Sequence, residues 1–224
     1  ANLPNITFTE GTLATVDPKD LPDFDYIVIH DFYSSLISAT PTQLHNLLEK
    51  KLKERGILFI SYICSPGGHS IAEICDLAAY STLSLETDLK GKAAAALDLL
   101  QHLKTNQAAY FEDNTIASLH IEKMLNNDLT SLSEEFFGGH YQPFYVHQVS
   151  SEMSNVGLTF AGNAIPHLNF IDLAAPAVFH NLLKNLNSRL DFEYYGDFIR
   201  NQSVRKDVFV KNMPSLSESE QIEN

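Results

Sequence analysis

Two runs of β-branched and aromatic residues, separated by one amphipathic segment, most strongly constrain how this chain can fold. Residues 24–30 read FDYIVIH and residues 56–62 read GILFISY. Between them, residues 42–55 carry leucines at helical spacing, with lysines and glutamates on the opposite face. This order of strand, helix and strand predicts a right-handed crossover unit with two parallel strands. Because the first run is apolar at nearly every position, we expect helices on both of its faces.

The middle of the chain has a different pattern, because helical periodicity continues there without any strand signal. We expect helices over residues 71–80, 90–103 and 114–126. Together they would form a helical insert of about 65 residues, which is small for an independent domain.

The remaining segments return to an alternation of strands and helices. A short strand is expected at residues 5–9, where apolar residues occupy every second position. Two further strands are expected at residues 158–163 and 206–211, with helices over 149–155, 177–186 and 191–200. The fold class is therefore α/β. Residues 213–224 are rich in Ser and Glu, which predicts a solvated tail.

Charge and cysteine usage exclude several classes of protein. The chain holds 15 Lys and Arg against 28 Asp and Glu, a net charge of −13. Such a surface repels phosphate backbones and anionic lipids, so we expect neither nucleic acid nor a membrane as a partner. No apolar run approaches the roughly 20 residues of a membrane span. The two cysteines, Cys64 and Cys75, fit a reducing cytoplasm, and no histidine pair has the spacing of a helical metal site, so no metal is expected.

Polar residues follow three of the expected strands. In open α/β sheets, ligands bind beyond the carboxyl ends of the strands. These ends fall at residues 10–13 (EGTL), 30–35 (HDFYSS) and 62–69 (YICSPGGH). Their histidine, tyrosine, serine and glycine residues suit a polar pocket that the backbone approaches closely. The same residue types also suit plain turns.

The motifs at these strand ends resemble a known family. They are similar to the second half of class I S-adenosylmethionine-dependent methyltransferases, and more narrowly to the bacterial group that carries a methyltransferase regulatory domain. That group has the patterns FDYI…HG, LKPGG…ISYN and PGW, followed by two later motifs. The corresponding segments here are residues 24–31 (FDYIVIHD), 52–62 (LKERGILFISY), 64–69 (CSPGGH), 140–164 and 198–212.

The sequence departs from the group's pattern at several positions. Residues 54–56 read ERG where the group has PGG, and Gly68 replaces the aromatic residue of PGW. Asp31 follows His30 where the group has glycine. These differences bear on which acceptor the pocket would take.

The resemblance implies an incomplete Rossmann-like sheet. The family's sheet order is 3-2-1-4-5-7-6, with the cofactor against a glycine-rich turn after the first strand. This chain has no G-x-G-x-G sequence, and residues 5–9 align with the third strand. It therefore resembles an N-terminally truncated methyltransferase with strands three to seven and a helical insert. Without its neighbours, the strand at residues 5–9 should be displaced, disordered or paired with another molecule.

The implied organisation has four parts. Residues 1–70 are the second half of the Rossmann-like core, and residues 71–147 are a helical regulatory or lid insert. Residues 148–212 end the core with the antiparallel strands six and seven. Residues 213–224 are a disordered tail.

The resemblance also assigns roles to residues at the strand ends. The implied catalytic residues are His30 and Tyr33; the cofactor-binding residues are Glu10, Gly11, Thr12, Leu13 and His30; the substrate-binding residues are Tyr62, Pro66, Gly67 and His69. His30 could deprotonate an attacking amine, since an unperturbed imidazole titrates near roughly 6.5. A turn or a loop hydrogen bond is the structural alternative for each of these residues.

The function implied is methyl transfer from S-adenosylmethionine to an acceptor, with a protein lysine amine as the first choice and a protein substrate as the partner. A homodimer is left open. Because the glycine-rich loop is absent, we expect this chain by itself to bind the cofactor poorly and to be inactive. The alternatives are a non-catalytic regulatory or interaction module and an α/β protein of unrelated ligand specificity. An in-frame G-x-G-x-G upstream in the gene would favour the enzyme.

Overall fold

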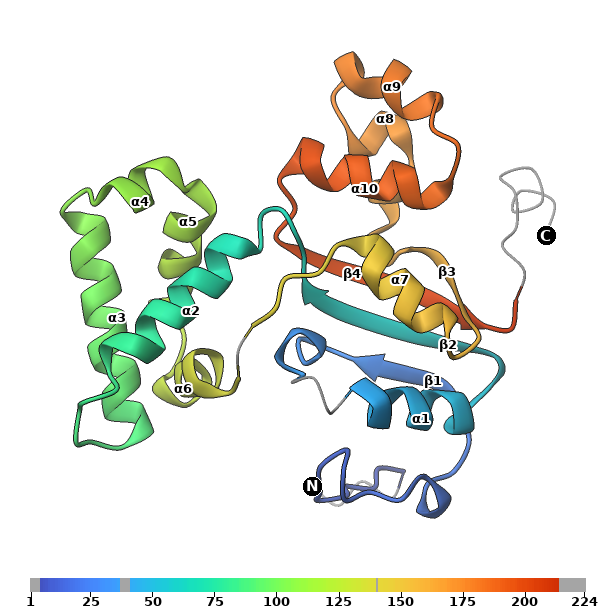
Figure 1. The fold of residues 1–224 in the computed structure, drawn as a ribbon, viewed down its shortest axis with the longest axis horizontal. Coiled ribbons are helices and arrows are strands. Elements are labelled where there is room, and N and C mark those ends of the chain that lie inside the picture. The colour runs from blue at the N-terminus through green and yellow to red at the C-terminus, as the bar shows by residue number, and fades with distance from the viewer. Residues whose placement is uncertain (1–4, 37–40, 140, 214–224) are drawn as a thin grey trace.

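The computed structural model describes residues 5–36, 41–139 and 141–213. The tail expected over residues 213–224 lies outside this range except for Met213. Figure 1 shows two lobes, one built on a sheet and one built of helices alone. Among the described residues, no helix has both the length and the apolar character needed to cross a membrane.

The sheet contains four strands in the order β1-β2-β4-β3. They are β1 (Phe24–Ile29), β2 (Leu52–Ile63), β3 (Leu158–Asn163) and β4 (Val204–Lys211). β1 and β2 are parallel, whereas β4 pairs antiparallel with both β2 and β3. This is the 4-5-7-6 part of the order that the resemblance implied, so the α/β, Rossmann-like fold class is confirmed.

The strand expected at residues 5–9 is not formed. Residues 6–10 have no regular secondary structure, and Phe8 is 91% exposed. The alternating apolar residues find no strand beside them in the described chain, and an unpaired strand cannot satisfy its backbone polar groups. The strand expected at residues 5–9 is therefore wrong for the described residues, and the three alternatives given for an unpaired segment stay predictions.

Helices cover one face of the sheet. α1 (Pro41–Lys51) and α7 (Val146–Ser154) pack Leu48 and Val149 against the sheet residues Leu58 and Ile60, all fully buried. The opposite face is partly open, since Tyr26 and Val28 of β1 are 69% and 66% exposed. The expectation that helices cover both faces of β1 is thus wrong for the described residues.

The helix expected over residues 42–55 ends four residues early. Its last residue is Lys51, because Leu52 already pairs with Phe24 in the sheet. β2 then bulges, so that Tyr26 pairs with Ile57, and Arg55 takes a φ of 60° within the bulge. Leu52 continues the helical spacing in sequence and nevertheless belongs to the strand.

The helical lobe follows β2. It contains α2 (His69–Ser81), α3 (Leu89–Thr105), α4 (Ala109–Asp113), α5 (Thr115–Met124) and α6 (Leu129–Phe137). These helices share a core of their own, in which Ala96, Leu100, Ile121 and Leu132 are fully buried. The helices expected over residues 71–80, 90–103 and 114–126 all lie within this lobe.

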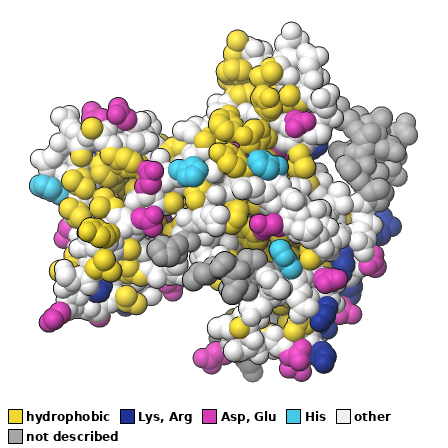
Figure 2. All heavy atoms as spheres, viewed as in Figure 1, with side chains coloured by type: hydrophobic (Ala, Val, Ile, Leu, Met, Phe, Trp, Pro, Cys, Tyr) yellow, Lys and Arg dark blue, Asp and Glu magenta, His cyan; other side chains and the backbone are white. Residues whose placement is uncertain are grey.

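A third group of helices connects β3 to β4. It contains α8 (Ile171–Ala174), α9 (His180–Lys184) and α10 (Arg189–Arg200). Phe170, Leu173 and Val178 are 60%, 65% and 80% exposed there. Figure 2 shows apolar atoms gathered over α8 and α9 on the face in view.

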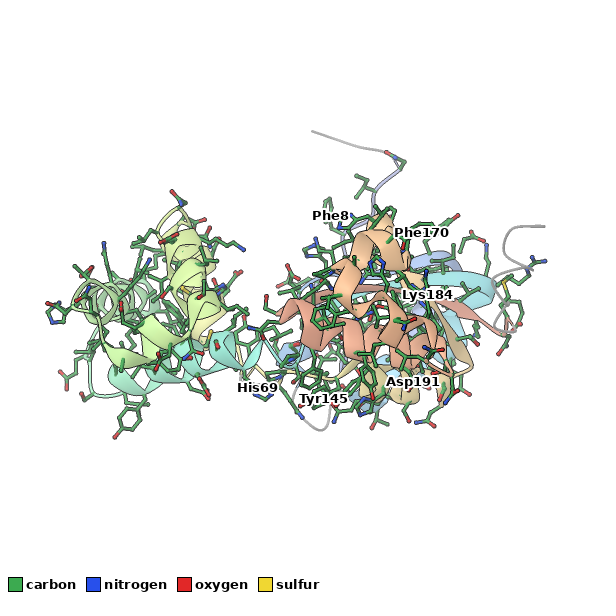
Figure 3. The ribbon with its side chains drawn as sticks, turned by 90° about the horizontal axis from the view of Figure 1, so that it is seen from above. Phe8, His69, Tyr145, Phe170, Lys184 and Asp191 are labelled. Atoms are coloured by element: carbon green, nitrogen blue, oxygen red, sulfur yellow. The ribbon has the colours of Figure 1, made fainter. Side chains whose placement is uncertain are left out.

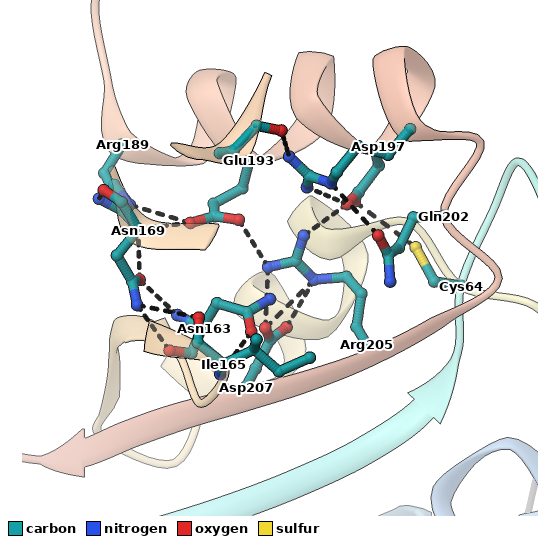
Figure 4. A network of polar contacts seen from close by, with 12 residues as sticks. Cys64, Asn163, Ile165, Asn169, Arg189, Glu193, Asp197, Gln202, Arg205 and Asp207 are labelled. Atoms are coloured by element: carbon teal, nitrogen blue, oxygen red, sulfur yellow. Dashed lines mark hydrogen bonds and ion pairs between the residues drawn. The ribbon is translucent and has the colours of Figure 1, made fainter. Parts of the chain in front are cut away.

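A buried guanidinium joins this third group to the sheet. Arg205 of β4 is fully buried and donates to Asp207 with Nε at 2.9 Å, to Asp197 with one terminal nitrogen at 2.7 Å, and to Glu193 with the other at 2.9 Å. Figure 4 shows these contacts converging from α10 and β4. Arg189 and Arg200 also reach Glu193 and Asp197, so three cations face three carboxylates. The network is balanced in charge, which buried ions require.

Replacing Arg205 should destabilise the fold strongly. In Arg205→Ala, three buried carboxylates lose their shared cation, so the free energy of unfolding should fall by about 3–5 kcal/mol. Urea denaturation measures this loss. The control is Lys53→Ala, which removes an exposed ion pair with Asp25 and should cost less than about 1 kcal/mol. Equal stability of Arg205→Ala and wild type would contradict the role given to the network.

Asp197 should titrate at an unusually high pH. Burial raises its pKa to about 6, although Arg205 and Arg200 act in the opposite direction. Because the folded-state pKa lies above the unfolded value, the contribution of Asp197 to stability is present at low pH and is lost as the pH rises through about 6. The carboxyl carbon shift in NMR measures the midpoint. Asp128, whose pKa is lowered by hydrogen bonds from Ser131 and Thr130, serves as the exposed control. A midpoint for Asp197 below that of Asp128 would refute the assignment.

Candidate functional site

A large cavity lies between the sheet and the helical lobe, and we call it the cleft. Its volume is about 880 Å³. The sheet side contributes the residues after β1 and the ends of β2 and β4, and the helical side contributes α2, α5 and α6. The lining residues used below are Asp31, Phe32, Leu36, Tyr62, Ile63, Ile71, His120, Glu134, Glu135, Tyr141, Val204 and Lys206. The cleft therefore lies at the carboxyl edge of the parallel strands, where ligands bind in this class of sheet.

Asp31 enters the cleft from an unusual backbone conformation. Its φ is 54°, in the left-handed region that favours glycine, which is the residue the resembling group has at this position. Two contacts with Ser61 of β2 hold it there. The Asp31 N–H donates to Ser61 Oγ at 2.7 Å, and Ser61 Oγ donates to Asp31 Oδ1 at 2.7 Å. These hydrogen bonds thus hold the carboxylate at the carboxyl edge of the sheet, where Asp31 lines the cleft.

His30 lies beside the cleft rather than in its lining. Its side chain is 57% exposed and stacks on Phe59 with 6.2 Å between ring centroids. Its Nδ1 lies 3.0 Å from Asp31 Oδ2. Asp31 therefore lies between His30 and the cleft: it contacts the imidazole and also lines the cavity.

The two tyrosines of the expected site have different positions. Tyr62 lines the cleft, is 1% exposed, and donates its hydroxyl to Asp207 at 2.7 Å. Tyr33 is 2% exposed and donates its hydroxyl to Glu152 of α7. Burial and the Glu152 carboxylate raise the pKa of Tyr33, and it is not among the described residues that line either cavity. Tyr33 thus lies buried against α7, outside the lining of both cavities, and its catalytic role stays a prediction.

Three other residues expected to bind substrate lie where β2 leads into the helical lobe, two of them in the loop after β2 and His69 as the first residue of α2. Gly67 donates its N–H to Gln202 O at 2.9 Å, and a Cβ on Gly67 would lie 2.3 Å from Asn201 O. His69 Nε2 lies 3.0 Å from Ser65 Oγ, and Pro66 stands between these residues in the loop. Figure 3 shows His69 where the two lobes meet. The structure therefore brings Tyr62 into the cleft but not Pro66, Gly67 or His69.

Three of the five residues expected to bind cofactor lie at a second cavity, of about 590 Å³, and His30 is not among its lining residues. Gly11, Thr12 and Leu13 line it, whereas Glu10 is exposed and is not among its lining residues. The other lining residues are Ala14, Val16, Phe32, Gln43 and Leu47. Phe32 lines this cavity and the cleft, so the two cavities share one aromatic side chain.

The helical side of the cleft was missed from sequence. His120 of α5 and Glu135 of α6 form an ion pair of 2.7 Å, with side chains 18% and 23% exposed. Tyr141 lies close by, and its pKa is raised by burial and by the charges of Cys75, Glu135, Asp31 and Glu134. No spacing in the sequence connects these residues with Asp31, because the contact depends on how the two lobes pack. Among the described residues, no group of His, Cys, Asp and Glu could hold a metal ion.

Comparisons with known proteins agree with this architecture. Residues 128–211 match a family described as a predicted methyltransferase regulatory domain. The resemblance to that group, given above from the motifs, is thereby confirmed. The matched segment begins at the residue before α6 and ends at Lys211, so it combines the last helix of the helical lobe with the end of the sheet.

Two solved structures share the fold. PKMT2 from Rickettsia typhi superposes with a TM-score of 0.68 at 22% identity, covering 91% of this chain and 38% of that protein. The structure of the same protein in complex with AdoHcy gives a TM-score of 0.72 at 23% identity, covering 90% of this chain and 39% of that protein.

Two curated relatives match at sequence level. An uncharacterised protein of Synechocystis is 26% identical over 225 residues, covering all of this chain and 44% of the relative. An uncharacterised protein of Rickettsia prowazekii is 25% identical over 218 residues, covering 94% of this chain and 38% of the relative. The chain thus spans less than half the length of the curated relatives it matches.

The left-handed conformation of Asp31 predicts an order of stability among its variants. Asp31→Gly and Asp31→Val both lose the hydrogen bond from Ser61 Oγ to the carboxylate and both keep the backbone N–H that donates to Ser61 Oγ. Only valine carries a β-branched side chain into positive φ. Asp31→Val should therefore be less stable than Asp31→Gly by about 1–2 kcal/mol. Urea denaturation of both variants measures the difference, and equal stability would show that φ is not constrained at this position.

Proposed function

We propose that this chain supplies the acceptor side of an S-adenosylmethionine-dependent methyltransferase whose acceptor is a protein lysine amine. The observation that carries the proposal is the pair of cavities that share Phe32 at the carboxyl edge of the sheet. The match to a methyltransferase regulatory domain supports it. So does the fold shared with a Rickettsia protein that has been solved with AdoHcy.

The smaller cavity has the chemistry to hold one end of the cofactor. Most of its lining side chains are apolar, and Phe32 offers a ring face on which a flat heteroaromatic group can stack. Thr12 and Gln43 add polar groups. The glycine-rich turn that would hold the rest of the cofactor has no counterpart in this sequence. These residues therefore fit part of the cofactor, and the supplied chemistry would be an electrophilic methyl group.

Residues of the cleft would prepare the acceptor. A lysine amine needs a free lone pair to act as a nucleophile, so its ammonium form must first lose a proton. Asp31 faces the cleft and lies 3.0 Å from His30, so a proton taken from the acceptor nitrogen can pass through Asp31 to the exposed imidazole. In this role His30 acts as the base expected from sequence, at one remove from the acceptor.

Cofactor binding tests the proposal directly. Titration calorimetry of S-adenosylmethionine and S-adenosylhomocysteine should show no binding to this chain and clear binding to the protein extended to the native start of its gene. If neither protein binds, the methyltransferase proposal fails, and the alternative of a non-catalytic regulatory module gains support.

Phe32 gives a sharper test in the extended protein. Phe32→Ala removes the ring that both cavities share, so S-adenosylhomocysteine should bind about fivefold more weakly. The matched control is Phe170→Ala, since Phe170 is 60% exposed, Phe32 is 47% exposed, and Phe170 lines neither cavity. If both substitutions weaken S-adenosylhomocysteine binding equally, Phe32 does not contact the cofactor.

A further inference from the structure

The helical wall of the cleft carries carboxylates that the methyl-transfer chemistry does not require. Glu134 and Glu135 of α6 line the cleft opposite Asp31 and Phe32 of the sheet wall. The following inference rests on the function proposed above and concerns which substrate segment the cleft admits.

The two glutamates differ in their partners. Glu135 is paired with His120 at 2.7 Å and is largely covered. Glu134 is exposed, and no ion pair or side-chain hydrogen bond of Glu134 occurs among the described residues. The helical wall therefore presents one fixed carboxylate and, beside it, one carboxylate that forms no ion pair with a cation of the described residues.

Charge around the cleft is negative from both walls. Asp31, Glu134 and Glu135 line it, with Lys206 and His120 as the basic side chains. The phenol of Tyr141 supports this arrangement, because its raised pKa owes part of its shift to all three carboxylates, after the effect of burial. The negative field is thus shared by the sheet wall and the helical wall.

Apolar residues accompany these charges. Leu36, Ile63, Ile71 and Val204 also line the cleft. A long cationic side chain can lay its methylene groups on such a surface while its charged end reaches a carboxylate. This combination suits lysine and arginine side chains better than a small metal ion or an anion.

We propose that Glu134 is a specificity-determining residue, which binds a basic side chain next to the acceptor lysine and so selects lysine-rich segments of a partner protein. Glu135, fixed by His120, contributes to the same field. The acceptor side chain itself reaches Asp31 on the sheet wall. The helical wall therefore determines which substrate segment binds, and the sheet wall binds the acceptor amine of that segment.

A lysine homopeptide is the probe for this proposal. Its dissociation constant, measured by calorimetry at low salt on this chain, should rise about fivefold in Glu134→Gln and by more than about tenfold in Glu134→Lys. The control is Glu112→Gln on α4, which makes the same change in net charge on the helical lobe, at an exposed residue outside the cleft lining. It should leave the dissociation constant unchanged. A homopeptide of glutamine should not bind.

The outcomes separate this inference from the proposed function. Equal affinities of wild type and Glu134→Gln, or equal losses in Glu134→Gln and Glu112→Gln, would overturn the role of Glu134. In the extended protein, Glu134→Gln should leave S-adenosylhomocysteine binding unchanged, because Glu134 does not line the smaller cavity. Loss of peptide selectivity with cofactor binding intact is the expected result, whereas absence of cofactor binding in every variant counts against the methyltransferase itself.

Discussion

The buried guanidinium of Arg205 is the interaction on which the arrangement of the sheet edge depends. It joins Asp207 of its own strand to Glu193 and Asp197 of α10, and Asp207 in turn accepts the hydroxyl of Tyr62 from β2. Tyr62, which lines the cleft, is therefore held in place through Asp207 by the buried Arg205. Because all three carboxylates contact the Arg205 guanidinium, and Asp207 also binds Tyr62, the ends of β2 and β4 are coupled to each other.

Much of the sheet could be predicted from sequence, because its strands carry runs of β-branched and aromatic residues. Burial does not follow that pattern everywhere, since Arg205, Asp207 and Lys211 occupy buried positions of β4. The boundaries were harder where one residue satisfies two patterns. Leu52 has helical spacing with the leucines before it, yet its backbone pairs with Phe24 in the sheet. This pairing places Leu52 in β2 and ends the helix at Lys51. Residues 5–9 alternate correctly for a strand but have no described neighbour with which to form one, so local pattern alone was misleading there.

The candidate site was predicted only along one side. Segments that follow β1 and β2 were expected at the sheet edge, and Asp31, Phe32 and Tyr62 do line the cleft. Which residue of a turn faces a cavity depends on its φ, and the value of 54° at Asp31 directs the carboxylate rather than the imidazole of His30 into the cleft. The opposite wall comes from α5 and α6. Their position against the sheet depends on packing between the lobes, which no periodicity in the sequence predicts.

Two backbone segments connect the lobes and run side by side, since Cys64 and Phe144 form a parallel bridge. Each lobe nevertheless has its own hydrophobic core. Substitutions inside the helical core can therefore accumulate without disturbing the sheet that forms the other wall of the cleft. The helical wall of the cleft can thus change over generations while the sheet wall keeps its shape. This modularity gives natural selection two nearly separate parts to act on within a single cavity.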